Sequence, residues 1–243
     1  FPPRVKPGDT ILVHAGLYKD NRFLYAQGGD AGTAPSDGTF FLTQSGTPDK
    51  PIVIRAAGDG EVIFDGDGAH NLFNVMAANY NYFEGLTIRN TDIAFLAGLK
   101  NITGSSGITV KKCRFEDIGR GVYTDWSGSR DFYIADNIFI GRNRSDVLMG
   151  WIGSTWKNLP GYPNRMVSEF AVKVYGSGHV VAHNSIANFH DGICHATYGD
   201  PDGTPNPIRE RLPVSIDFYN NDITNVDDNC LEADGATHNI RVL

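Results

Sequence analysis

The chain has 243 residues, of which 41% are hydrophobic and 20% charged, and its formal net charge is −7. This composition is typical of a folded globular chain and excludes an intrinsically disordered one. The basic residues are scattered instead of forming a stripe, which argues against nucleic acid as a partner, and no run of about 18 apolar residues is present to span a membrane.

The first part of the chain consists of short apolar segments separated by turn residues. A Pro-Gly turn precedes an apolar strand over Thr10–Val13. Residues 20–48 are polar and rich in Gly, which predicts a long loop. Pro51–Ala56 and Glu61–Phe64 predict two further strands, closed by an Asp-Gly-Asp-Gly turn.

A strand followed by an Asn or Cys and an apolar residue then recurs along the chain. The segments are GITVKKCRF at 107–115, DFYIADNIF at 131–139, HVVAHNSI at 179–186 and VSIDFYNNDI at 214–223. Their anchor positions are Cys113, Asn137, Asn184 and Asn221. An Asn at the same position of successive coils can form an asparagine ladder, in which each side-chain amide bonds its neighbours.

Each anchor leads to a second short strand, GVYTD at 121–125, ICHAT at 193–197 and CLEAD at 230–234. No window shows convincing helical periodicity, so these strands cannot belong to βαβ units. Recurrence every 20–30 residues or so is the signature of a solenoid, and we predict an all-β chain folded as a right-handed parallel β-helix. The main alternative is an antiparallel sandwich, which would show two-residue hairpin turns instead.

Two stretches of sequence carry a resemblance to known proteins. The run KPGDTILVHAGLY, with KPIVIRAAGDGEVIFDG after it, resembles the opening coils of bacterial polysaccharide lyases of the chondroitinase B and alginate lyase type, within the pectate-lyase-like superfamily. The later run HDGICHATYGDPDG…DFYNNDITNVDDNCLEADG…HNIRV is similar to bacterial β-helix repeat proteins of uncharacterised activity. The resemblance implies the β-helix fold and a carbohydrate-active protein, while such coils also build hydrolases, epimerases and phage adhesins.

We expect residues 1–243 to form one β-helix domain that is cut at both ends. The parent protein is expected to carry a secretion signal and further coils, and to be secreted or periplasmic. A monomer is expected at full length. The three cysteines, Cys113, Cys194 and Cys230, form no CxxC pair, so they are interpreted as small apolar residues inside the coil.

Two long insertions, at 141–168 and 199–213, emerge beside the same column of strands. Long loops on a rigid scaffold are where binding residues concentrate, and sugars stack on exposed aromatic rings. The predicted substrate-binding residues are Trp151, Trp156, Tyr162, Tyr175, Arg209 and Arg211. For Trp151 and Trp156, the alternative is that the rings cover the side of the coil.

Strand alternation places one set of titratable side chains outside the coil. If Val172 points inward, Lys173 points outward, and the spacing from the Asn anchors puts His195 and Glu232 at the same place in the next coils. Rungs about 4.8 Å apart would bring the three side chains within about 10 Å of one another. A slip of one residue would reverse these assignments.

This column suggests β-elimination on an acidic, uronate-containing polysaccharide. Lys173 or His195 would remove the proton beside the uronate carboxylate. We assign catalytic roles to Lys173, His195 and Glu232, and we expect Asp228, Glu232 and Asp234 to bind Ca²⁺ through oxygen ligands. The partner is then a polysaccharide, and Ca²⁺ is the cofactor.

Two other functions fit the same residues. A glycoside hydrolase needs two carboxylates, and five acids are available for that role: Asp125, Asp191, Asp228, Glu232 and Asp234. In a non-catalytic carbohydrate-binding or structural solenoid, Asp191 and Asp228 would be turn residues and His195 a surface side chain. A lyase releases unsaturated ends that absorb in the ultraviolet, a hydrolase releases reducing ends alone, and a binding module releases neither.

Overall fold

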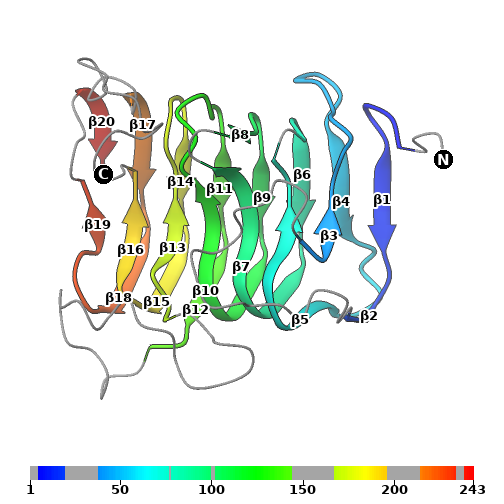
Figure 1. Cartoon of the computed structure of the whole chain (residues 1–243), viewed down its shortest axis with the longest axis horizontal. Helices are drawn as coiled ribbons and strands as arrows, with labels where there is room; N and C mark the ends of the chain where they lie inside the picture. The colour runs from blue at the N-terminus through cyan, green and yellow to red at the C-terminus, as the bar shows by residue number, and fades with distance from the viewer. Residues whose placement is uncertain are drawn as a thin grey trace.

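The chain is an elongated coil of short strands. The computed structural model describes residues 5–19, 38–76, 78–99, 102–143, 167–195, 214–233 and 238–243. Within these ranges the regular elements are strands, and no helix that could cross a membrane is found. Successive coils follow one another along one axis, from the N-terminus to the C-terminus (Figure 1).

One sheet runs the length of the coil on a single side. It contains eight strands, and each pairs in parallel with the strands of the coils before and after it. In spatial order they are β1 (Thr10–Val13), β4 (Ile52–Ala56), β6 (Asn81–Glu84), β9 (Thr109–Lys111), β11 (Tyr133–Ala135), β14 (Val180–Ala182), β17 (Val214–Tyr219) and β20 (His238–Val242).

A second sheet of twelve strands closes the other two sides of the coil. Its long strands β5 (Val62–Asn74), β7 (Thr87–Leu99) and β10 (Arg114–Thr124) contain register shifts, where each strand passes from one side to the next. The remaining strands are β2 (Gly16–Lys19), β3 (Phe40–Phe41), β8 (Thr103–Gly104), β12 (Ile138–Gly141), β13 (Phe170–Lys173), β15 (Ser185–Phe189), β16 (Asp191–Cys194), β18 (Asp222–Val226) and β19 (Leu231–Glu232).

The two halves of the long strands continue on different sides of the coil. The first half of β10 pairs with β12, followed by β15 and β18. The second half of β10 pairs with β13, followed by β16 and β19. We call this second side, made of the second halves of β5, β7 and β10 together with β13, β16 and β19, the Lys173 face. Its strands pair in parallel with one another, and the end of β7 also forms a short antiparallel pair with β8.

The core lies inside the coil, where equivalent side chains of successive coils stack. Phe73 stacks on Phe95 with ring centroids 5.0 Å apart, and Phe115 stacks on Phe139 at 4.3 Å. Apolar residues from all three sides contact this column and are almost fully buried. Because each coil can bury its apolar side chains only against its neighbours, stacking supplies the main driving force for the fold.

The Asn anchors are joined by hydrogen bonds along the coil axis. The Nδ2 of Asn137 donates to Oδ1 of Asn184 at 3.0 Å, and the Nδ2 of Asn184 donates to Oδ1 of Asn221 at 3.0 Å. The same oxygens also accept the backbone N–H groups of Asn137 and Asn184, while Asn137 Oδ1 accepts the N–H of Cys113. Asn137 and Asn184 are each 1% exposed, so these bonds satisfy amide groups that would otherwise be buried without partners.

The parallel pairing confirms the prediction of an all-β parallel β-helix and excludes the antiparallel sandwich. The strand over Thr10–Val13 lies where the sequence predicts it. Phe40–Phe41, expected within the loop at 20–48, instead form β3 and pair with β5, because the ring of Phe40 packs against Phe64 and Phe73. Most of the three predicted loops lies outside the described residues.

Candidate functional site

The Lys173 face carries an outward column of four side chains on successive coils. Tyr123 pairs with Lys173, Lys173 with Cys194, and Cys194 with Glu232. Residues at the same register of a parallel sheet point the same way, and successive strands are about 4.8 Å apart. Lys173 and Glu232 therefore share this face, with Cys194 rather than His195 between them.

Lys173 belongs to a compact group of polar side chains at the end of β10. Its Nζ lies 3.2 Å from Oδ1 of Asp125, and the hydroxyl of Tyr123 donates to the other oxygen of the same carboxylate. The Lys173 side chain is 11% exposed and that of Asp125 is 15% exposed, so water screens their attraction only weakly. Burial and the carboxylate of Asp125 hold the pKa of Tyr123 well above its ordinary value, and the phenol keeps its proton.

A second charged pair borders this group. The guanidinium of Arg120 lies against the Tyr123 ring, 4.6 Å from its centroid, and its Nε donates to the carboxylate of Glu169. The Nζ of Lys173 lies 4.9 Å from the centroid of Phe170 on the same strand, β13. Aromatic faces and buried counter-ions thus hold both cations in fixed positions.

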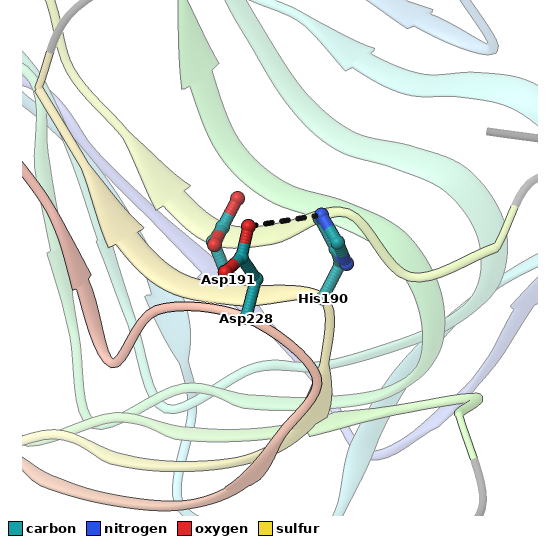
Figure 2. Close-up of side chains that lie close together, drawn as sticks. All are labelled: His190, Asp191 and Asp228. Carbon is teal, nitrogen blue, oxygen red and sulfur yellow. Dashed lines mark ion pairs between the residues drawn. The ribbon is translucent and has the colours of Figure 1, made fainter. Parts of the chain in front are cut away.

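The acidic side chains gather on the C-terminal side of Lys173. His190, Asp191 and Asp228 each present one ligand atom, and these atoms lie within 4.8 Å of one another. Figure 2 shows the three side chains converging, with an ion pair of 3.8 Å between Nε2 of His190 and Oδ2 of Asp228. We call these three residues the acid–imidazole cluster. Glu232 lies nearby, and its Oε2 accepts a bond of 2.6 Å from Nδ2 of Asn229.

Asp191 has the most perturbed carboxyl group of this cluster. Burial raises its pKa to about 7, and the negative charges of Glu232 and Asp228 act in the same direction. A hydrogen bond from the backbone N–H of Asn229 and the charge of Lys173 oppose this shift. Near neutral pH, Asp191 is therefore divided between the acid and the carboxylate.

One additional residue in the last coil creates the cluster. Phe189 pairs with Val226, 37 residues later, whereas Ile193 pairs with Leu231, 38 residues later. The turn between these strands therefore places two residues, Asp227 and Asp228, opposite His190, and both of their backbone N–H groups donate to the carbonyl of His190. Such bulges reorient side chains, and here one places an acid on each side of the imidazole.

The cluster fits a divalent cation in its charge and its donor atoms. Two carboxylates and one imidazole converge, and the pKa of Asp191 is raised by burial and, in second place, by the charges of Glu232 and Asp228, which a cation would compensate. Ca²⁺ prefers oxygen ligands, which Asp191 and Asp228 offer, while imidazole is a ligand for transition metals. Of the Ca²⁺ ligands expected from the sequence, Asp228 belongs to this cluster, Glu232 is bonded to Asn229, and Asp234 lies outside the described residues.

The structure places His195 inside the coil, so its expected outward position is wrong. Its side chain is 0% exposed, and its ring stacks on Phe218 at 5.6 Å. Burial lowers its pKa, which keeps the imidazole neutral. The register between β13 and β16 is the physical reason, because Lys173 pairs with Cys194, 21 residues later (194 − 173), and not with His195.

The predicted substrate-binding residues are described only in part. Tyr175 is 2% exposed, so its ring is buried instead of lying on the surface, as its outward placement would require. The other predicted contacts fall outside the described residues: Trp151, Trp156, Tyr162, Arg209 and Arg211.

Sequence reasoning did not assign His190 to the site, and it treated Asp191 only as a candidate hydrolase acid. A signal for both was present, because His190 and Asp191 lie at the start of β16 (Asp191–Cys194) and Asp227 and Asp228 lie in the turn before β19 (Leu231–Glu232). Counting three residues backward from the paired residues Ile193 and Leu231 aligns His190 with Asp228. Counting forward from the Asn anchors, as in the sequence analysis, passes over the additional turn residue.

The pKa of Asp191 predicts how stability depends on pH in the presence of a chelator. Between about pH 4 and pH 7, Asp191 is protonated in the folded chain and ionised in the unfolded chain, so the free energy of unfolding should decrease as the pH rises through this window. Asp191→Asn should remove most of that decrease. Urea unfolding at several pH values measures it, with Asp222→Asn as an exposed control. An unchanged pH dependence in Asp191→Asn would contradict the assignment.

Comparison with known proteins gives two structural likenesses. No family model matches the chain, and no curated protein matches it. The alginate lyase from Paenibacillus sp. str. FPU-7 is 18% identical, with 93% of this chain and 70% of that chain covered and a TM-score of 0.43. Pectate lyase Pel9A is 15% identical, with 97% and 74% covered and a TM-score of 0.30. Both likenesses lie below the similarity at which a shared activity follows, and the parallel β-helix of this chain is established by its own strand pairing.

Proposed function

We propose that the chain is a polysaccharide lyase that cleaves an acidic, uronate-containing polymer by β-elimination. One observation carries this proposal: Lys173, Asp125 and Tyr123 are joined on one outward face, beside a cluster suited to a cation. β-Elimination needs a base, an acid and a positive charge near the uronate carboxylate. These residues offer all three along one wall of the coil.

Lys173 acts as the base and Tyr123 as the acid. Lys173, which pairs with Asp125 as an ammonium ion, first loses a proton to solvent; its free amine then takes the proton from the carbon next to the uronate carboxylate, and Asp125 stabilises the ammonium ion that forms again. The bond to the leaving glycosidic oxygen breaks as a carbon–carbon double bond forms. Tyr123, which keeps its proton because its pKa is raised, gives that proton to the leaving oxygen. Proton transfer from Lys173 through Asp125 to Tyr123 then restores both groups.

The positive charge near the substrate comes from the cluster beside Lys173. A divalent cation bound by His190, Asp191 and Asp228, whether the Ca²⁺ expected from the sequence or a cation that favours imidazole, would neutralise the uronate carboxylate. The aromatic and basic residues Trp151, Trp156, Tyr162, Arg209 and Arg211 remain our candidates for binding the rest of the sugar chain. A substrate of this kind is a polymer outside the cytoplasm, which supports a secreted or periplasmic location.

The perturbed pKa of Asp191 favours a second candidate, a glycoside hydrolase. A protonated Asp191 beside the carboxylates of Glu232 and Asp228 provides the acid and carboxylate that glycoside hydrolysis requires. His195 has no part in either reaction as we propose it, because its side chain lies inside the coil.

A panel of polymers separates these functions. The chain is incubated with polymannuronate, polygalacturonate, a glucuronate-containing glycosaminoglycan and a neutral glucan, and both ultraviolet absorbance and reducing ends are measured. A lyase raises both signals with a uronate polymer and leaves the glucan intact. Reducing ends without absorbance would identify a hydrolase, and retardation in an affinity gel with neither signal would identify a binding module; either result would overturn the lyase assignment.

A further inference from the structure

The acid–imidazole cluster contains a buried His positioned by carboxylates at both ring nitrogens. The His190 side chain is 1% exposed, with Nδ1 4.0 Å from Oδ2 of Asp227 and Nε2 3.8 Å from Oδ2 of Asp228. Both distances exceed the roughly 2.7–3.2 Å of a direct hydrogen bond. One Zn–N bond and one Zn–O bond placed end to end span about 4.2 Å. The distance from Nε2 of His190 to Oδ2 of Asp228 is shorter than this span, so one cation could contact both atoms. The gap therefore has the size of a shared cation.

Asp227 lies behind the imidazole as an independent feature of the site. Its side chain is 3% exposed, and its Oδ1 has no hydrogen-bond partner among the described residues. Its Oδ2 accepts a bond of 3.1 Å from Nδ2 of Asn143. A buried carboxylate facing Nδ1 favours the proton on that nitrogen, which turns the lone pair of Nε2 toward Asp191 and Asp228.

The side chain of Asn143 is in turn held by the backbone of Ser168. Its Nδ2 donates to the carbonyl of Ser168, and the backbone N–H of Ser168 donates to its Oδ1, both at 3.1 Å. The side chain is thereby fixed while it holds Asp227. A continuous path of contacts therefore runs from Ser168 through Asn143 and Asp227 to His190, and it orients the imidazole in the way typical of metal-binding histidines.

We propose that His190, Asp191 and Asp228 form a site for a divalent transition-metal cation of the Zn²⁺ class, and that Asp227 and Asn143 position its imidazole. Imidazole is a strong ligand for Zn²⁺ and related cations and is foreign to the oxygen-only sites that Ca²⁺ prefers. Three protein ligands leave a coordination position open for water or a substrate oxygen. Asp228, whose side chain is 27% exposed, lies on the side from which solvent reaches the site.

Direct binding measurements test this proposal without any substrate, so its failure is distinguishable from failure of the lyase assignment. The chelator-treated protein is dialysed against Zn²⁺, Mn²⁺ or Ca²⁺, and bound metal is counted by mass spectrometry. We expect one Zn²⁺ per chain that excess Ca²⁺ does not displace. His190→Gln should weaken Zn²⁺ binding by at least 100-fold, and Asp227→Asn by about 10–100-fold.

Two control variants separate this site from adventitious binding. His14→Gln removes an exposed imidazole that also pairs with a carboxylate, Asp59, at 2.7 Å, and Cys230→Ser removes the exposed thiol near the cluster. Both variants should bind Zn²⁺ as the parent does. The proposal is overturned by preferential binding of Ca²⁺, by retention of Zn²⁺ in a folded His190→Gln protein, or by loss of Zn²⁺ in either control.

Discussion

Replacing Lys173 with arginine should lower turnover of a uronate polymer by about 10²–10⁴-fold, the usual contribution of a general base. Arginine keeps the positive charge that faces Asp125 and remains long enough to contact it. It cannot lose its proton at any ordinary pH, so it cannot remove a proton from the substrate. Initial rates from ultraviolet absorbance, with thermal unfolding in parallel, measure the two effects separately.

Lys111 offers a matched control on the other sheet. Its Nζ lies 3.4 Å from Oδ2 of Asp136 and 5.9 Å from the centroid of the Tyr133 ring, close to the arrangement of Lys173 with Asp125 and Tyr123. Lys111→Arg should leave turnover unchanged. Full turnover in a folded Lys173→Arg protein would exclude Lys173 as the base and would leave the carboxylates of the cluster to carry the chemistry.

The largest effect on stability should come from Arg142, which follows β12 and joins several coils. Its guanidinium lies 2.7 Å from Oδ1 of Asp92 and 3.1 Å from Oδ1 of Asp117, and it also donates to the carbonyl of Thr91. The side chains of Arg142 and Asp92 are each 3% exposed. Arg142→Ala leaves the charge of Asp92 buried beside His70 without its guanidinium counter-ion, which should reduce the free energy of unfolding by about 3–5 kcal/mol.

Urea unfolding monitored by circular dichroism measures this loss. The control is Arg241→Ala, which breaks a pair of similar length with Asp217 on the surface, where the arginine side chain is 62% exposed. Exposed pairs contribute about 0–1 kcal/mol, so the control should unfold almost as the parent does. Adding Asp92→Asn to Arg142→Ala should recover part of the loss, because the buried charge is then gone. Equal effects of the two arginine substitutions would refute a special role for Arg142.

The bulge in the last coil affects both the site and the register. Because Asp227 and Asp228 occupy the place of one residue, an acid lies on each side of His190 and the strand that follows is shifted by one. Deleting one of these two residues would remove the bulge and the acid on one side of His190, while Glu232 would stay opposite Cys194. The acid–imidazole cluster and the irregular strand register in this coil thus have one structural origin, the bulge.

The architecture could be predicted from sequence because it depends on patterns that repeat. Short alternating strands, Gly and Asn turns and the recurring anchors Cys113, Asn137, Asn184 and Asn221 all favour the same coil, and each copy reinforces the others. The outward position of Lys173 and Glu232 could also be predicted, because side chains alternate between inside and outside along both strands as expected.

Which residue lies between Lys173 and Glu232 on this face was decided only by tertiary structure. Asp and Asn fit almost any turn, so the sequence around Asp227 and Asp228 does not reveal how many residues the turn holds. The count is set by which carbonyl accepts each N–H group, and here the His190 carbonyl accepts two. The extra residue forms a bulge, so Glu232 pairs with Cys194 and keeps its outward position. The pairing of Lys173 with Cys194, 21 residues later (194 − 173), places His195 inside the coil against Phe218, and the bulge brings Asp228 to His190.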